Sequence, residues 1–425
     1  MDRRKFLATG AALPALPILG CNADEYARRL PAPPCDPHDE KYWQGMRWHF
    51  FIPKGQAYCN TSTLGASPKV VVNAINEHMR YVETQLASCD YSTGTPNFLA
   101  GYQDEPELRK RVGALMGCKM EEVGLTRNAT MGMSYIAQGL DLKKGDQVIL
   151  TDQEHPGGRC AYDVRAKRHG IEIIEVKIPK PANDPEALVQ AFADAVTDRT
   201  SVLAVPHVTS AFGIILPVKQ IIAAVRAKKP DVYVVLDGAQ ALGHVKVDVI
   251  DFDCDAYFSS PHKWLLAPKG TGVLFVRQST NERVWTTIAN GQWDFAEDVG
   301  WRFSQIGTGN QSLHKGFEAG LDFLDRIGME TIYARIKSIG DRLRTGLKTI
   351  DGVTIQSSTH PTMCAGITNY TLRGWDGLDA ARHLFATEKI MPRGVADGIR
   401  QSLHIYTNFA DVDRTLDRIK KMLKA

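Results

Sequence analysis

Ala256-Tyr257-Phe258-Ser259-Ser260-Pro261-His262-Lys263-Trp264 is the most informative stretch of this 425-residue chain. Its first three residues are apolar and predict a buried β-strand. A polar cluster with one lysine follows at once. Because burial disfavours the ammonium form, a lysine held at the end of such a strand can lose its proton and attack a carbonyl group. A surface loop with an incidental lysine would have the same local pattern, so a second feature is needed to identify a reactive lysine.

That second feature is an aspartate at the end of another strand-like run. The apolar run 232–236 leads directly into Asp237-Gly238-Ala239-Gln240, and Asp237 precedes Lys263 by 26 residues. Pyridoxal phosphate (PLP) needs a lysine for its aldehyde and a carboxylate that keeps its pyridinium nitrogen protonated. Alone, Asp237 could begin a turn or cap a helix. Together with Lys263, it favours a PLP site.

The two motifs, Asp-Gly-Ala-Gln and Ser-x-His-Lys-Trp, resemble those of the class V aminotransferase family of fold type I PLP enzymes. That family includes cysteine desulfurases, selenocysteine lyases, kynureninases and isopenicillin N epimerase. The resemblance runs from about Tyr58 to the C-terminus, nearly the whole chain after its leader. It implies a PLP cofactor and a homodimer. The motifs together are specific for the family but not for the reaction.

The pattern of apolar runs predicts an α/β fold with a large and a small domain. Strand-like runs alternate with amphipathic stretches, which favours a mostly parallel, doubly wound sheet. The runs are 146–150, 201–205, 232–236, 256–258 and 272–276, and the amphipathic stretches include 186–196 and 218–228. After residue 315 helical stretches dominate, at 321–349 and 410–424. The expected divisions are a signal peptide at 1–21, an N-terminal arm at 22–57, a large PLP-binding domain at 58–315 and a small α+β domain at 316–425.

Polar side chains follow four of the predicted strands. They are Glu154-His155, His207 to Ser210, Asp237 and Lys263. In sheets of this type, ligands bind at the carboxyl ends of the strands. The resemblance assigns roles to these residues. Lys263 would hold the cofactor and move protons, Asp237 would pair with the ring nitrogen, and His155 would stack on the ring. Gln240 would form a hydrogen bond with the phenolic oxygen of PLP. Ser210 would bond the same oxygen, at a position where relatives often carry asparagine. For His155 alone, a turn histidine remains an alternative.

The phosphate of the cofactor needs several donors in a small volume. Asn128 is a good N-cap for the helical stretch 131–139, and a helix N-terminus presents free N–H groups to an anion. A cap needs no ligand, so the capping role alone also explains this segment. The resemblance assigns phosphate contacts to Ala129, Thr130, Ser260 and His262, and to Thr308 from the neighbouring subunit of the dimer.

The resemblance also predicts that one arginine binds the substrate's carboxylate, whereas the cysteine nucleophile of some family members is missing from the corresponding loop. Arg400 begins a segment similar to the family's Arg-x-Ser-x-x-x-Tyr-Asn motif, with Thr407 inserted, and the arginine of that motif holds the substrate's α-carboxylate. A salt-bridging structural arginine is the alternative. Cysteine desulfurases carry a nucleophilic cysteine on the preceding loop, whereas residues 389–395 have none. Cys364 lies farther upstream in an expected strand.

The N-terminus has the pattern of an export signal. Arg3-Arg4-Lys5-Phe6-Leu7 matches the twin-arginine motif, and the short apolar stretch 7–20 suits a signal peptide rather than a membrane span. We therefore expect export of the folded protein by the twin-arginine translocase into a periplasm. Cys21 ends a sequence similar to a lipobox, which would anchor the protein to a lipid, and ordinary signal-peptide cleavage is the competing prediction.

Composition narrows the function classes further. A formal charge of +3 over 425 residues gives no electrostatic case for nucleic-acid binding. The eight cysteines include no Cys-x-x-Cys pair and no zinc-like Cys/His spacing, so we expect no metal site. An oxidising compartment permits disulfides, but packing cysteines are the simpler expectation.

Three functions are compatible with these residues. The first is an exported PLP enzyme acting on the amino group of a small-molecule or peptide-derived substrate, by transamination or epimerisation. The segments 153–158 and 306–310 look closest to the isopenicillin N epimerase-like branch. An exported relative of that kind modifies a side chain during maturation of the siderophore pyoverdine. The second is a PLP-dependent C–S or Cα–Cβ lyase without a catalytic cysteine. The third is a binding protein that has lost catalysis, against which the complete set of Lys263, Asp237 and His155 argues.

Overall fold

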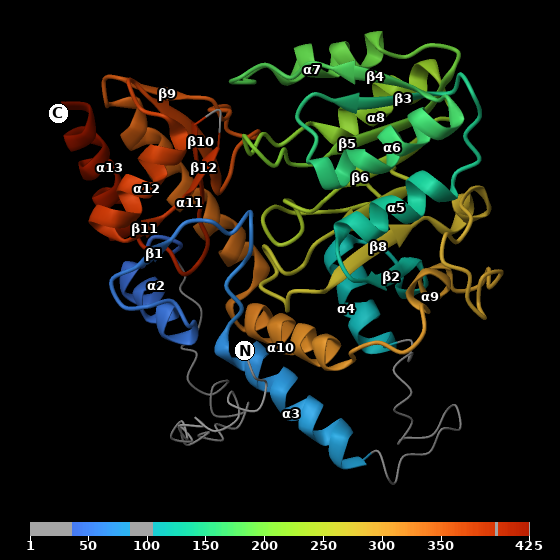
Figure 1. Cartoon of the computed structure of the whole chain (residues 1–425), viewed down its shortest axis with the longest axis horizontal. Helices are drawn as coiled ribbons and strands as arrows, with labels where there is room; N and C mark the ends of the chain where they lie inside the picture. The colour runs from blue at the N-terminus through green and yellow to red at the C-terminus, as the bar shows by residue number, and fades with distance from the viewer. Residues whose placement is uncertain (1–35, 86–104, 396–397, 425) are drawn as a thin grey trace, which may run out of the picture.

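The computed structural model describes residues 36–85, 105–395 and 398–424, which form two parts lying side by side (Figure 1). The larger part is built on a seven-stranded sheet. The smaller part carries a four-stranded sheet together with the C-terminal helices. The protein is therefore an α/β protein with a smaller C-terminal α+β part, as the sequence predicts.

The large sheet has five neighbouring parallel strands and two further strands at one edge. Its order is β2-β8-β7-β6-β5-β3-β4, and β8 runs antiparallel to both of its neighbours. The bounds are β2 Val123–Thr126, β3 Gln147–Thr151, β4 Glu172–Val176, β5 Thr200–Pro206, β6 Tyr233–Asp237, β7 Ala256–Ser259 and β8 Gly272–Val276. The carboxyl ends of the five parallel strands consequently meet at one edge of the sheet.

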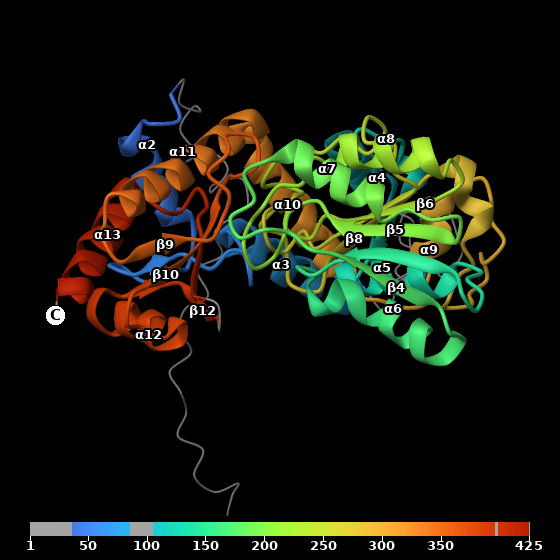
Figure 2. The same ribbon diagram turned by 90° about the horizontal axis from the view of Figure 1, so that it is seen from above.

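Helices cover both faces of this sheet because its strands are apolar on both sides. In β6, Val234 and Leu236 belong to one hydrophobic cluster, while Tyr233 and Val235 belong to the other. Figure 2 shows the helices of the two faces above and below the sheet. One face carries α4 Pro106–Met116, α7 Pro185–Asp194 and α8 Val218–Lys228, and the other carries α5 Ala129–Gly139 and α6 Pro156–His169. The predicted doubly wound arrangement is confirmed.

The small part has its own core between an antiparallel sheet and three helices. The sheet order is β12-β13-β10-β9. The bounds are β9 Val353–Ile355, β10 Ile367–Leu372, β12 Arg393–Val395, β13 Gly398–Ser402, α11 Met329–Lys348, α12 Gly377–Glu388 and α13 Phe409–Lys424. Fully buried Ile339 and Leu343 of α11 pack there with Ile419 of α13.

The segment before residue 60 packs on the small part. Its strand β1 (Ala57–Tyr58) pairs in parallel with β11 (Ile390–Met391), and Glu40 accepts a hydrogen bond of 2.9 Å from the Phe409 amide. The long helix α3 (Lys69–Gln85) then packs along α10 (Ser312–Ile327), which spans the boundary expected after residue 315. The remaining short elements are α2 Glu40–Met46, η2 Arg47–His49, η3 Met120–Glu122, η4 Gln278–Arg283 and α9 Val299–Ser304.

Two sequence expectations for this half of the chain are wrong. The predicted helical stretch 321–349 is two helices, because the chain turns at Gly328 between α10 and α11 with a φ of 85°. Such a φ is readily adopted only by glycine. Cys364 does not lie in a strand but in the bend before β10, where its thiol donates to the His360 carbonyl at 3.2 Å.

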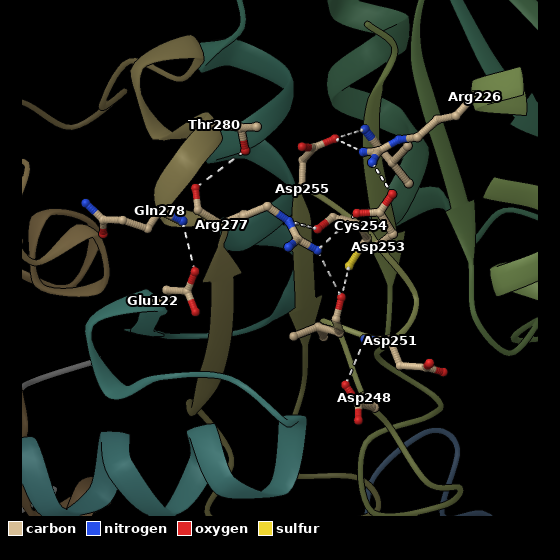
Figure 3. Close-up of polar contacts among 12 residues, drawn as sticks. Glu122, Arg226, Asp248, Asp251, Asp253, Cys254, Asp255, Arg277, Gln278 and Thr280 are labelled. Atoms are coloured by element: carbon tan, nitrogen blue, oxygen red, sulfur yellow. Dashed lines mark hydrogen bonds and ion pairs between the residues drawn. The ribbon is translucent and has the colours of Figure 1, made fainter. Parts of the chain in front are cut away.

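An ion-pair network fixes the end of the sheet at which β6 and β7 begin (Figure 3). Buried Asp255 accepts from Arg226 at 2.8 Å and from the Val234 amide at 2.7 Å. Arg226 also pairs with Asp253, and Arg277 donates to the Cys254 carbonyl at 2.9 Å. The network links α8, β6, β7 and β8, so it stabilises the sheet from the end opposite the strands' carboxyl ends.

Two further observations concern membranes and disulfides. No helix within the described ranges is long and apolar enough to cross a bilayer. Among the described cysteines all are free, and Cys59 and Cys254 are buried as the packing interpretation expects; the described set is Cys59, Cys118, Cys160, Cys254 and Cys364. The expected signal peptide and Cys21 lie outside the described residues.

Candidate active site

One cavity lies at the carboxyl ends of the parallel strands, and most of the predicted site residues line it. Its walls come from the ends of β5, β6 and β7 and from the first turns of α5 and α6. The lining residues are Ala129, Thr130, His155, Gly157, Gly158, Pro206, Val208, Ser210, Asp237, Ala239, Gln240, Ser260 and Lys263. Of the predicted set, His262, Thr308 and Arg400 lie outside this lining.

Lys263 lies four residues after the end of β7, within a turn that the rest of the fold holds closely. The Gly65 amide donates to the His262 carbonyl at 3.0 Å, and a Cβ on Gly65 would lie 2.0 Å from the Lys263 carbonyl oxygen. Burial lowers the pKa of Lys263 to about 8, and the nearby Arg400 and Arg393 act in the same direction, while Asp237 opposes them. The amine is therefore uncharged, and so nucleophilic, far more often near neutral pH than that of an ordinary lysine.

Asp237 lies at the bottom of the cavity, at the end of β6. Its carboxylate accepts a hydrogen bond of 2.8 Å from the Ala239 amide, and burial raises its pKa. Glu154 is close by, because a Cβ on Gly158 would lie 2.8 Å from Asp237 Oδ2 and 3.7 Å from Glu154 Oε2. Burial, with the charge of Asp237 added, raises the pKa of Glu154 to about 8. At neutral pH, Glu154 is thus mostly protonated and Asp237 is the carboxylate of the pair.

His155 caps helix α6 and presents an exposed ring beside the cavity. Its Nδ1 accepts a hydrogen bond of 3.0 Å from the Gly157 amide, so this nitrogen carries no proton. Burial lowers the pKa of His155, and the charges of Lys263 and Arg393 add to the effect. The imidazole is consequently neutral, which suits a ring that stacks on a flat aromatic group.

Two hydrogen bonds hold the side-chain amide of Gln240 in place at the cavity wall. Its Nε2 donates to the Ser62 carbonyl at 3.0 Å, and its Oε1 accepts from Trp264 Nε1 at 2.9 Å. One hydrogen of the Nε2 group remains for a ligand. The indole of Trp264 stacks on His244 with ring centroids 3.7 Å apart. Gln240 and the backbone of Lys263 are therefore supported by the same aromatic stack.

The first turn of α5 forms the donor-rich end of the cavity. Asn128 caps the helix by accepting from the Met131 amide at 2.9 Å, as predicted. The Ala129 amide donates to Ser260 Oγ at 3.0 Å, and Thr130 exposes its hydroxyl beside Gly157. A helix N-terminus with two hydroxyl groups is a suitable site for a phosphate.

Two of the predicted phosphate contacts lie elsewhere in the subunit. His262 Nδ1 approaches the Thr271 carbonyl at 3.4 Å, and burial lowers the pKa of this ring to about 4. Thr308 is exposed on the loop before α10, beside a separate pocket whose walls include Gly307, Gly309 and Arg127. The role of Thr308 in a neighbouring subunit stays a prediction.

Arg400 lies above the cavity on β13, where it is 3% exposed. It donates to the Ser210 carbonyl at 2.7 Å and to Thr63 Oγ1 at 2.8 Å. No carboxylate of the described residues forms an ion pair with it, so a structural salt bridge does not account for this buried cation. Burial lowers the pKa of Arg400 to about 10, and Arg393 adds to the shift.

Sequence reasoning missed three groups at this site. Glu154 belongs to a quoted motif, but the motif does not show that its carboxyl group lies beside Asp237. Thr63 and Arg393 were also missed: Arg393 donates to Thr63 Oγ1 at 3.1 Å, across a separation of 330 residues. The signal that could have drawn attention to Arg393 is a cation within residues 389–395, the segment that corresponds to the cysteine-bearing loop of cysteine desulfurases.

Comparison with known proteins assigns the fold and the cofactor. The family model for aminotransferase class V matches residues 61–415. Isopenicillin N epimerase of Streptomyces clavuligerus is 27% identical over 75% of this chain and 83% of its own length. A cysteine desulfurase of Haloferax volcanii is 26% identical over 85% and 88%, respectively.

Solved structures of fold type I PLP enzymes share the fold. A cysteine desulfurase from Thermococcus onnurineus superposes with a TM-score of 0.79 at 23% identity, covering 90% of this chain and 98% of its own. A C-DES mutant with glycine covalently linked to its PLP cofactor gives a TM-score of 0.78 at 24% identity, covering 88% and 98%.

The cavity residues fit pyridoxal 5′-phosphate, which is the cofactor. When bound, PLP supplies an aldehyde for an amine and a ring that accepts electrons released at the substrate's Cα. Lys263 would hold the aldehyde, and Asp237 would keep the ring nitrogen protonated. The first turn of α5, with Ser260, would bind the phosphate. This PLP-dependent enzyme belongs to the class V aminotransferase family.

Proposed function

We propose that the enzyme acts on the amino group of an amino acid or peptide-derived substrate by transamination or epimerisation, without an enzyme thiol. The observation that carries the proposal is the makeup of the wall above Lys263. Two arginines, Arg393 and Arg400, stand there, and no cysteine lines the cavity among the described residues. Buried Cys59 is a poor thiolate, because burial raises its pKa to about 12.

Transamination and epimerisation both need a base that moves a proton at the Cα atom of the substrate. Lys263 would be that base when its amine is not bound to the cofactor, because its lowered pKa suits proton transfer near neutral pH. Neutral His155 and carboxylate Asp237 would hold the ring in place during that transfer. No step calls for sulfur.

A direct assay separates the reaction types. Purified enzyme is incubated with a panel of L- and D-amino acids in D2O. Epimerisation exchanges the Cα proton and changes the optical rotation without a keto acid; transamination requires a keto acid. For the second candidate, a C–S lyase would release ammonia, a keto acid and a thiol or sulfide, and a Cα–Cβ lyase would release the side-chain fragment and a smaller amino acid. We expect exchange or keto-acid-dependent amine transfer, and release of sulfide alone would reject the proposal.

Replacing each cysteine by alanine in turn tests the thiol-free chemistry. Every variant should keep its PLP colour and at least about half of its activity, because a reaction at an amino group needs no sulfur nucleophile. Loss of turnover in one variant that stays folded and coloured would reinstate a thiol mechanism.

Export and assembly complete the proposal. The twin-arginine motif at Arg3 and Arg4 supports delivery of the folded, PLP-loaded enzyme to a periplasm, with lipid attachment at Cys21 as one form of retention there. A siderophore side chain, as in pyoverdine maturation, is one suitable peptide-derived substrate. The exposed position of Thr308 supports a homodimer, in which this residue would reach the phosphate bound by the neighbouring subunit. Replacing Arg3 and Arg4 by lysine should leave the protein in the cytoplasm, and unchanged export would reject this part.

A further inference from the structure

Two arginines without carboxylate partners meet above the cavity. Arg393 of β12 and Arg400 of β13 are register partners in the antiparallel sheet. Both guanidinium groups donate to the same oxygen, Thr63 Oγ1, at 3.1 Å and 2.8 Å. That hydroxyl in turn donates to Asn60 Oδ1 at 2.7 Å. The segment 60–63 therefore holds two cations together.

The charge at this point is uncompensated by the protein. Neither arginine forms an ion pair with an acidic residue in the described parts of the chain, and Arg400 Nε is a buried donor without a partner. Bringing like charges together in a partly dehydrated site is unfavourable unless an anion offsets them. Both arginines lie close enough to Lys263 to help lower its pKa, an effect that is smaller than that of burial.

The two cations lie at different depths. Arg400 is 3% exposed, whereas the side chain of Arg393 is exposed to solvent. A single α-carboxylate bound at Arg400 would neutralise only the inner charge. We propose that Arg393 binds a second anionic group of the substrate, so that the enzyme selects amino-group substrates that carry two carboxylates or a comparable pair of anions. This inference rests on the proposed function and specifies its substrate class.

The proposal can be tested by binding alone. Calorimetry on the PLP-loaded enzyme would compare glutarate, with two carboxylates, against butyrate, with one, because neither acid has an amine and neither reacts. One charge-assisted contact with Arg393 should make glutarate bind roughly 10- to 100-fold more tightly than butyrate. Arg393→Gln should remove that preference and leave butyrate binding unchanged, while Arg400→Gln should weaken both ligands.

Matched variants exclude general effects. Arg382→Gln removes another exposed arginine of the small part, one that pairs with exposed Asp379, and should keep the preference for glutarate. Arg393→Lys keeps the charge and should retain part of the preference. The PLP absorbance of each variant verifies that the site is intact.

Three results would overturn the inference. The first is glutarate binding to the wild type no more tightly than butyrate. The second is an equal weakening of both acids by Arg393→Gln, which would mean that one carboxylate uses both arginines. The third is loss of the preference in Arg382→Gln as well. Because these acids do not react, a preserved glutarate preference together with failure of the amino-acid assay would reject the proposed reaction and leave the substrate class standing.

Discussion

Replacing Arg400 tests whether this side chain binds the α-carboxylate of the substrate. Its guanidinium is fixed by the Ser210 carbonyl at 2.7 Å and Thr63 Oγ1 at 2.8 Å, with Nε left as a buried free donor. Arg400→Lys keeps the charge, but one ammonium group cannot hold both anchors and also present a planar pair of donors. Arg400→Gln removes the charge as well.

The size of the effect follows from the burial of the site. Removing one member of a buried, hydrogen-bonded charge pair costs about 2–5 kcal/mol, largely because the other charge is left unpaired. At about 1.4 kcal/mol per decade, Arg400→Gln should weaken amino-acid binding roughly 30- to 4,000-fold. Arg400→Lys should lie between this variant and the wild type. PLP occupancy should not change, since Arg400 lies outside the cofactor cavity.

The assay is a titration followed by the visible absorbance of bound PLP. It compares the amino acid that gives the largest wild-type change with the corresponding amine, which lacks the carboxylate. Both variants should bind the amine as the wild type does. Wild-type binding of the amino acid by Arg400→Lys would refute the carboxylate role and would favour a substrate whose reacting amine has no adjacent carboxylate.

Three further predictions concern the fold and the lysine. Asp255→Asn should lower the free energy of unfolding by about 2–4 kcal/mol, because it removes a buried charge partner of Arg226. Asp253→Asn changes a carboxylate that is 58% exposed and should lower it by less than about 1 kcal/mol. Equal denaturation midpoints of the two variants would show that the network of Figure 3 does not stabilise the fold. PLP capture by the apoenzyme should accelerate with pH through about 8 and then level off, because the lowered pKa of Lys263 makes the amine neutral there; a rise continuing to pH 10, after correction with N-acetyl-lysine, would contradict this. Gly65→Ala should reduce PLP occupancy several-fold, because its Cβ would meet the Lys263 carbonyl, while Gly291→Ala, with open space around its Cβ, should not; full occupancy in both would refute the close approach.

Local sequence predicts the parts of this fold that are determined by continuous apolar runs. The strand at 272–276 and the helix at 218–228 have the bounds that the pattern indicates, and Asn128 caps α5 as expected. The break at Gly328 was missed because apolar periodicity continues across it. Edge strand β4, mostly exposed or half-buried, has no continuous apolar signal either.

Site residues that belong to a local sequence motif could be predicted. Contacts between segments that are far apart in the sequence could not. Asp237 ends β6 and Lys263 follows β7, and because these neighbouring parallel strands end at the same edge of the sheet, the fold class alone brings the two residues together. The meeting of Arg393 with Thr63 depends on the small part packing against the N-terminal segment, and no local pattern records that. The position of Glu154 beside Asp237 likewise results from tertiary packing.

The most direct test of the whole account is the identity of the lysine that holds PLP. The purified protein should be yellow, and borohydride reduction followed by peptide mapping should place the pyridoxyl group on Lys263. Lys263→Ala should stay folded and lose the covalent link, although it can retain PLP non-covalently through the phosphate end and Asp237. A pyridoxyl group on another lysine of the wild type, or an unchanged covalent link in Lys263→Ala, would contradict the account.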